Sequence, residues 1–173
     1  MAVDLLEFQR NLWTRLQKAR TTDVVSSRLA VSCAGQRLLL ALPQTDSIMP
    51  LPRVASIPAV QSWYSGLVNV RGNLYGVIDL AEFLGGEPTI RNMNTRIVVV
   101  AQKLKVNAAI MVSHILGLQN LNRFKSRPIA KDAPAWIRAE YADENGDTWR
   151  ELDLAVLTAN ERFMKVAALE VAI

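Results

Sequence analysis

The sequence predicts a mainly β protein, on three observations. From residue 28 onward, short apolar runs alternate with turn residues, which is typical of an all-β sandwich or barrel. Short glycine-containing loops at 34–36 and 143–147 favour hairpins between neighbouring runs. Helical periodicity is confined to the N-terminus and two short segments. The predicted strands are 28–33, 37–42, 47–51, 67–70, 74–78, 96–101, 106–112, 115–118, 136–142 and 148–152.

The N-terminal residues 4–19 have the pattern of an amphipathic helix. Their apolar side chains recur at three- and four-residue spacing, in one stripe made of Leu5, Phe8, Leu12, Leu16 and Ala19 and widened by Leu6 and Trp13. The polar segment 21–27 interrupts this pattern. We therefore expect residues 1–27 to form a helix and linker joined to a main domain of residues 28–173.

Two short helical segments are predicted within the main domain. Asp79 is a suitable N-cap with Glu82 three residues later, and glycines at 85 and 86 would end the helix, so we expect it over 79–84. Apolar spacing near the C-terminus predicts helical turns over 154–168, starting again at 158–161, where Thr158 and Glu161 have the spacing of a capping box.

Prolines and polar residues indicate where the strands are interrupted. Pro43, Pro50, Pro52 and Pro58 cannot donate to a strand ladder, so we expect their segment at a sheet edge, where a partner could bind. The polar stretch 85–94 is the expected seam between two groups of strands.

The composition is that of a soluble globular protein. Of the 173 residues, 50% are apolar and 21% charged, and no run approaches the roughly 20 apolar residues that a membrane span requires. The N-terminus lacks the pattern of a secretory signal, so we expect a cytoplasmic protein. Cys33 is the single cysteine, which excludes an internal disulfide and predicts a buried, inert thiol.

The charge pattern gives little support for nucleic-acid binding. The net charge is +4, but 20 basic residues are interspersed with 16 acidic ones. The basic cluster Arg123, Lys125, Arg127 and Lys131 contains Phe124 as its one aromatic residue, and we expect a solvated loop there. A nucleic-acid-binding barrel that uses this cluster remains an alternative.

Residues that could support catalysis are few. The sequence has one histidine and one cysteine and lacks the common zinc and phosphate-loop motifs, so it predicts no catalytic residue, metal or cofactor. Ser113 and His114 could be imagined as the centre of a small hydrolase, but adjacent residues on a strand point to opposite faces. Glu151 and Asp153 share one strand face, which we expect to meet solvent.

The most distinctive segment is 63–80, where Arg71 stands between two apolar strands. A guanidinium in this position must reach water or a hydrogen-bonding partner. Two interpretations are equally compatible with the pattern. Arg71 is either a turn residue that pairs locally with a carboxylate, or a recognition group at the lip of an apolar groove.

This segment resembles the signature of CheW-like domains. Gly66, then Asn69-Val70-Arg71-Gly72, then an apolar strand that ends in Asp79-Leu80 recur in that family at this spacing. The resemblance extends from residue 28 through 94–100 to the last strand pair and helix, and it leaves the N-terminal helix outside. That helix, with 149–154 and 163–167, is similar to the branch associated with type IV pili and twitching motility, the PilI-type adaptors.

The resemblance implies a fold of two intertwined five-stranded SH3-like β-barrels. It also implies a non-enzymatic adaptor that couples the cytoplasmic tip of a methyl-accepting chemotaxis receptor to the regulatory domain of a CheA-type histidine kinase. Such an adaptor is recruited to receptor arrays at the inner membrane, without inserting into the membrane and without binding nucleic acid. A CheW adaptor of flagellar chemotaxis is the alternative within the family.

The resemblance also assigns residues by position. It implies a receptor-facing side that includes Thr45, Gly66, Asn69, Arg71 and Leu118, and a kinase-binding surface that includes Leu42 and Ile48. The sequence departs from the family pattern at three places. Residues 112–114 are Val-Ser-His where many members have Val-Asp-Gly, and Gly76 stands where a proline is frequent. Residues 44–47 are less acidic and less aliphatic than the corresponding family segment.

Overall fold

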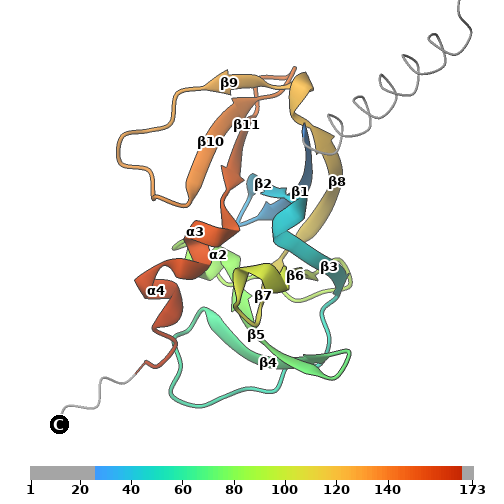
Figure 1. Ribbon diagram of the computed structural model, residues 1–173, viewed down its shortest axis with the longest axis vertical. Helices are drawn as coiled ribbons and strands as arrows, with labels where there is room; N and C mark the ends of the chain where they lie inside the picture. Colours follow the sequence, from blue (N-terminus) through green and yellow to red (C-terminus); the bar gives the residue numbers. More distant parts are fainter. Residues whose placement is uncertain (1–25, 169–173) are drawn as a thin grey trace, which may run out of the picture.

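Two β-sheets form the body of the protein, which a computed structural model describes for residues 26–168 (Figure 1). The first sheet contains β1 (Ser27–Cys33), β2 (Gln36–Ala41), β8 (His114–Asn120), β9 (Lys125–Arg127), β10 (Ile137–Ala142) and β11 (Thr148–Leu152). The second contains β3 (Thr45–Pro50), β4 (Tyr64–Val70), β5 (Asn73–Asp79), β6 (Arg96–Val100) and β7 (Ala108–Val112). The helix predicted over 4–19 lies outside the described residues.

The path of the chain interlocks the two sheets. The strand orders are β8-β1-β2-β11-β10-β9 and β3-β6-β7-β5-β4, so the chain leaves the first sheet after β2 and returns to it at β8. Each sheet contains one parallel pair, β2 with β11 and β5 with β7, among antiparallel ones. The predicted mainly β, CheW-like fold class is confirmed. The first sheet has six strands instead of five, because β9 forms inside the stretch predicted as a solvated loop.

Short helices connect the strands. They are α2 (Leu80–Phe83), α3 (Leu154–Ala159) and α4 (Glu161–Met164), with 3-10 turns η1 (Leu42–Gln44), η2 (Gln102–Leu104) and η3 (Leu121–Arg123). As predicted, the Asp79 carboxylate caps α2. Helix also starts again within 158–161, but its cap is Asn160 and not Thr158, because Thr158 lies inside α3. The prediction of helix over 154–168 was too long. Helix ends at Met164, because the chain then becomes extended and Ala167 pairs with Val60.

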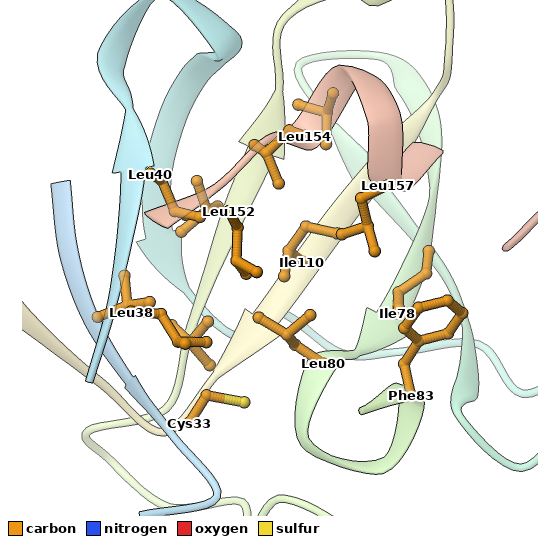
Figure 2. Packing of buried hydrophobic residues seen from close by; sticks show 14 of the residues in the cluster. Cys33, Leu38, Leu40, Ile78, Leu80, Phe83, Ile110, Leu152, Leu154 and Leu157 are labelled. Atoms are coloured by element: carbon orange, nitrogen blue, oxygen red, sulfur yellow. The ribbon is translucent and has the colours of Figure 1, made fainter. Parts of the chain in front are cut away.

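One hydrophobic core lies between the two sheets, and Leu154 and Leu157 of α3 point into it (Figure 2). Phe163 of α4 belongs to the same core. The side chains that point into it from the first sheet, the second sheet and the helices include Leu38, Leu40, Leu152, Ile78, Ile110, Leu80, Phe83, Leu154 and Leu157. An aromatic group extends the core, since the rings of Trp63 and Phe83 lie 5.1 Å apart. Cys33 is fully buried here, as predicted.

The far face of each sheet carries a smaller apolar cluster. On the second sheet, Val68, Val77, Ile97 and Met111 are covered by the segment that follows β3. On the first sheet, Trp149 packs beside Phe124 of the chain that leads into β9. Both sheets are therefore covered on two faces, which is how a curved, barrel-like sheet buries its side chains.

The expected seam at 85–94 was wrong. Strands β6 and β7 follow this stretch, yet they lie in the same sheet as β3, β4 and β5, which precede it. The stretch is instead a loop tied back to the core. Thr89 donates to the Asp79 carboxylate from its backbone nitrogen at 2.8 Å and from its hydroxyl at 2.7 Å.

The proline-rich segment lies at a sheet edge, as predicted, because β3 is the edge strand of the second sheet. Beyond Pro50 the chain crosses to the opposite edge, where Ala55 and Leu67 exchange two backbone hydrogen bonds of 2.8 Å. A Cβ atom on the neighbouring Gly66 would overlap the carbonyl oxygen of Ala55. The crossing is thus possible because residue 66 has no side chain.

Candidate protein-interaction site

Arg71 lies at the tip of the β4–β5 hairpin. It occupies the two-residue turn with Gly72, and both residues have left-handed φ values, +53° and +87°. Such values belong to the turn type that favours tight hairpins. The side chain of Asn69 supports the turn by accepting from the Gly72 nitrogen at 2.9 Å. Within residues 26–168 no carboxylate pairs with Arg71, so the hairpin presents an exposed cation.

Gly66 is buried in the same hairpin, so it offers no surface to a partner. Its φ is +130°, and an added Cβ would also lie 2.9 Å from a methyl group of Val54. The predicted receptor-side role of Gly66 is therefore limited to shaping β4. Asn69, which is exposed, both shapes the turn and lies on its surface.

Leu42 and Thr45 build the turn that leads into β3. Thr45 donates from its hydroxyl to the Leu42 carbonyl at 2.9 Å, which closes η1 and starts the strand. The Leu42 side chain is half-buried and packs against the shared core. Ile48, three residues into β3, is 43% exposed on the open edge of the second sheet. Of these residues, Ile48 is the one that offers a partner a large apolar surface.

Leu118 lies on β8, the edge strand of the first sheet. Its cross-strand neighbour is Leu29, followed across the sheet by Leu40 and Leu152. The three inner leucines are buried, whereas Leu118 is 64% exposed because no further strand covers it. Leu118 is thus the exposed last member of a row of four cross-strand leucines, at the rim of the shared core.

The predicted residues fall on three places: the β4–β5 hairpin tip, the η1 turn with β3, and β8. Figure 1 shows β3 and β8 along one side of the ribbon. They belong to different edges of the two sheets, since β3 and β4 are the opposite edges of the second sheet and β8 is an edge of the first. This arrangement suits contacts with extended protein partners better than capture of a small molecule.

Several exposed apolar residues were not singled out from the sequence, among them three in the loop after α2 and on β8. Ile90 and Met93, in the loop after α2, are 81% and 90% exposed, and Leu116 on β8 is 40% exposed. The loop is well supported, since the Thr95 hydroxyl donates to the Ile90 carbonyl at 3.1 Å and Thr89 is bonded to Asp79. The available signal was two isolated apolar residues inside a polar, turn-rich stretch.

Ser113 and His114 border a surface hollow of about 400 Å³, with Thr89 and Ile90 on its other side. Ser113 is held by its backbone nitrogen, which donates to the Ser32 carbonyl at 3.0 Å. Within residues 26–168 the two side chains form no hydrogen bond with each other, and no group of three or more His, Cys, Asp or Glu is placed to hold a metal ion. The pair therefore lacks the linked geometry that a nucleophile and its base require.

The basic cluster is spread over η3, β9 and the following loop. Arg127 donates to the Thr148 hydroxyl at 3.1 Å and to the Gly146 carbonyl at 3.2 Å, which fastens β9 to the β10–β11 hairpin. Arg123 lies 4.0 Å from Glu144. Two of the four cations are thus engaged with the protein's own hairpin.

Glu151 does not meet solvent, and that expectation was wrong. Its side chain is 2% exposed and accepts from Arg28 Nε at 2.7 Å and from the Tyr141 hydroxyl at 3.0 Å. The strand alternation was correct, but Glu151 shares its face with Trp149, and that face is the covered far side of the first sheet. Burial, with the nearby Glu151 charge, raises the pKa of Tyr141. Asp153 is half-buried and caps α3.

Two further ionisable groups have shifted pKa values with structural causes. The hydrogen bond from Trp149 Nε1, 2.9 Å long, lowers the pKa of Asp143, which lies in the turn before β11. Burial raises the pKa of the Cys33 thiol to about 12, and the charge of Asp79 adds to the effect. Neither group lies on the three candidate surfaces. Both pKa shifts therefore reflect burial and hydrogen bonding inside the folded protein and do not mark a binding site.

Comparisons with known proteins agree with this architecture. Residues 28–162 match the model of the CheW-like domain. Protein PilI from Pseudomonas aeruginosa is 30% identical over 120 residues, which are 69% of this chain and 67% of that protein. The crystal structure of the scaffolding protein TtCheW from Thermoanaerobacter tengcongensis superposes with a TM-score of 0.66 at 18% identity, covering 79% of this chain and 94% of that one. Every helix within residues 26–168 is too short or too polar to cross a bilayer.

Proposed function

The chain belongs to the CheW-like domain family, and on this premise we propose that it is an adaptor that couples a chemoreceptor to a CheA-type histidine kinase. In this role the protein acts through its surfaces and makes or breaks no bond. The observation that carries the proposal is the family match over 28–162, which includes both sheets and all three candidate surfaces.

The more specific proposal is an adaptor in a chemosensory array that controls type IV pilus twitching motility. It is supported by the similarity to Protein PilI, at 30% identity over most of both chains. We propose that the protein works in the cytoplasm and is recruited to receptor arrays at the inner membrane. If it instead serves flagellar chemotaxis, deletion of its gene will impair swimming and leave twitching intact.

The receptor-facing side is proposed to combine Arg71 with Leu118. Arg71 supplies an exposed cation on a rigid hairpin, and Leu118 supplies an apolar contact at the rim of the core. Few such anchors can carry most of the affinity of a protein interface. Gly66 and Asn69 contribute by shaping the hairpin that presents Arg71, and Thr45, in the turn before β3, is proposed to lie on the receptor-facing side as well.

The kinase-binding surface is proposed to lie on β3. Ile48 is exposed there on an open sheet edge, and the packed side chain of Leu42 fixes the turn that precedes it. An apolar side chain on an edge strand offers both a hydrophobic contact and backbone groups to a partner.

A binding experiment with two single variants tests these assignments. Purified full-length chain is mixed either with the regulatory domain of the CheA-type kinase or with the cytoplasmic tip of a receptor from the same organism. We expect Arg71→Glu to lose receptor binding and keep kinase binding, and Ile48→Glu to do the reverse. Val156→Glu, on the exposed side of α3, is the matched control and keeps both.

Two outcomes count against the proposal in different ways. If the unmodified chain binds neither partner, the adaptor function is wrong. If both variants stay folded and bind both partners normally, the function stands and the assigned surfaces are wrong. Circular dichroism and urea unfolding establish that each variant is folded.

A further inference from the structure

The η2 turn, which connects β6 to β7, lies at the same end of the second sheet as Thr45 and Arg71. In strand order, β3 begins at this end, β6 ends there, β7 and β5 begin there, and β4 ends there. Thr45 and Arg71 belong to the two outer strands, and η2 joins the second strand to the third. Neighbouring strands lie about 4.8 Å apart, so this end of the sheet is about 20 Å wide. A partner segment that reaches from Thr45 to Arg71 therefore passes η2.

Hydrogen bonds hold the η2 turn on both sides. The Ala101 nitrogen donates to the Gln44 carbonyl at 2.9 Å, which joins the start of the turn to the residue before β3. The Gly76 nitrogen donates to the Asn107 carbonyl at 2.9 Å, which joins the end of the turn to β5. The turn is thus fixed to the strands on either side of it.

Two exposed lysines lie on this turn. Leu104 and Val106 pack against the shared core, whereas Lys103 and Lys105 are exposed. Lys105 has a left-handed φ of +56°, and its nitrogen closes the turn. Among the residues that the structure describes, no carboxylate forms an ion pair with either ammonium group. Both charges are therefore available to a partner.

The charge at this end of the second sheet is mainly positive. Residues 44–46, 70–73 and 101–107 contain Arg71, Lys103 and Lys105 as cations and Asp46 as the one carboxylate. All four side chains are exposed. A surface with an excess of one sign of charge favours a partner of the opposite sign.

A surface hollow of about 480 Å³ adjoins the two lysines. Leu104 and Val106 line it from the η2 side, Ala155 and Ala159 from α3, and Met164 from α4. The Met164 side chain is 63% exposed. An apolar hollow beside unpaired cations fits a segment that carries apolar and acidic side chains together.

We propose that Lys103, Lys105 and this hollow belong to the receptor-facing side and bind an acidic, amphipathic segment of the receptor tip. Carboxylates of that segment pair with the two ammonium groups, while one of its apolar side chains enters the hollow. The inference rests on the proposed adaptor function, because it names the chemistry of the partner on the side that carries Arg71. Exposed charges of this kind act mainly on the association rate and its salt dependence.

Binding of the receptor tip to full-length variants tests the inference. At about 0.1 M salt, Lys103→Glu/Lys105→Glu should weaken receptor binding at least about tenfold and leave binding of the kinase regulatory domain within about twofold. The matched control is Lys125→Glu/Lys131→Glu, which makes the same change of charge at exposed lysines of β9 and the loop after it. The control should keep receptor binding within about twofold.

Two milder changes separate the charge from the hollow. Lys103→Gln/Lys105→Gln removes the charges and keeps polar side chains, so the association rate measured by stopped flow should depend less on salt than in the unmodified chain. Ala159→Trp fills the hollow and should weaken receptor binding. Val156→Trp, on the exposed side of the same helix, should not.

The outcomes distinguish this inference from the adaptor function. If the unmodified chain does not bind the receptor tip, both are wrong. If it binds, and Lys103→Glu/Lys105→Glu binds as well as its control, the inference is overturned and the adaptor function stands. Unchanged salt dependence in the glutamine variant would likewise overturn it, and unchanged binding by Ala159→Trp would overturn the assignment of the hollow.

The same two lysines could instead contact anionic lipid headgroups. In that case the unmodified chain will sediment with phosphatidylglycerol vesicles, the Lys103→Glu/Lys105→Glu variant will not, and receptor binding will be the same for both. That result would also overturn the inference.

Discussion

A side chain on Gly66 would overlap the carbonyl oxygen of Ala55, so β4 and the segment after β3 approach as closely as glycine alone permits. The approach lets Leu67 and Ala55 exchange two hydrogen bonds and joins the two edges of the second sheet. Arg71 lies five residues further along the same strand and turn. The position of this exposed cation therefore depends on a buried glycine.

Gly66→Ala is expected to destabilise the fold strongly. The φ of +130° and the overlap with Ala55 together should lower the free energy of unfolding by about 3 kcal/mol or more. Gly35→Ala is the control, because Gly35 has a φ of +72° with open space around it and should cost about 1 kcal/mol. Urea unfolding measures both, and equal losses would contradict the steric explanation.

Two Arg–Glu pairs with the same 2.7 Å Nε–Oε1 distance should differ in their effect on stability. Arg28–Glu151 is almost fully buried, so Glu151→Ala takes the carboxylate from a desolvated guanidinium and should cost about 3 to 5 kcal/mol. In Arg150–Glu140 the arginine is 43% exposed, and Glu140→Ala should cost at most about 1 kcal/mol. Chemical denaturation of both variants tests the contrast, which fails if the two losses are similar.

Asp79→Ala should release the loop that carries Ile90 and Met93. The carboxylate caps α2 and accepts two hydrogen bonds from Thr89, so its loss leaves buried donors unsatisfied and should cost about 2 to 4 kcal/mol. The Thr89 amide should exchange with solvent much faster. Asn160→Ala removes an exposed cap of α4 and should cost only about 1 kcal/mol. A Thr89 amide that stays protected would refute the tie between Asp79 and the loop.

Stability should fall in alkaline solution because of Cys33. Its pKa is about 12 in the folded protein against an ordinary value of 9.0, so above pH 9 the unfolded state loses a proton that the folded state keeps. Cys33 therefore makes its full contribution to the free energy of unfolding below pH 9. As the pH rises toward 12, that free energy falls by up to about 1.4 kcal/mol per pH unit. Unfolding measured between pH 9 and 11 should show a shallower decline in Cys33→Ala, and parallel curves would disprove the assignment.

Local sequence patterns were sufficient for most of the fold. Short apolar runs located the strands, and Asp79 was identified as a cap because a cap needs only its next two or three residues. Strand β9 was missed, since three residues that include Lys125 and Arg127 have no apolar period to recognise. It exists because β10 supplies its backbone partners.

The features that the sequence did not reveal depend on distant parts of the chain. Alternation placed Glu151 on one face of β11, but only the fold shows that this face is covered and that Arg28 lies within 2.7 Å. The packing of Leu42 against the core likewise depends on residues far away in the sequence. Gly66 was assigned through the family resemblance, and its structural reason, the approach of Ala55, comes from a separate segment.

The parallel pairing of β2 with β11 has a consequence for synthesis of the protein. Trp149 pairs with Arg37, so the β1–β2 hairpin has no neighbour on that side until β11 has also been translated. Its leucines at 38–40 are fully buried in the finished protein and exposed in the meantime. Contacts this distant in sequence form slowly. The nascent chain must therefore keep this hairpin from aggregating until its last strand arrives.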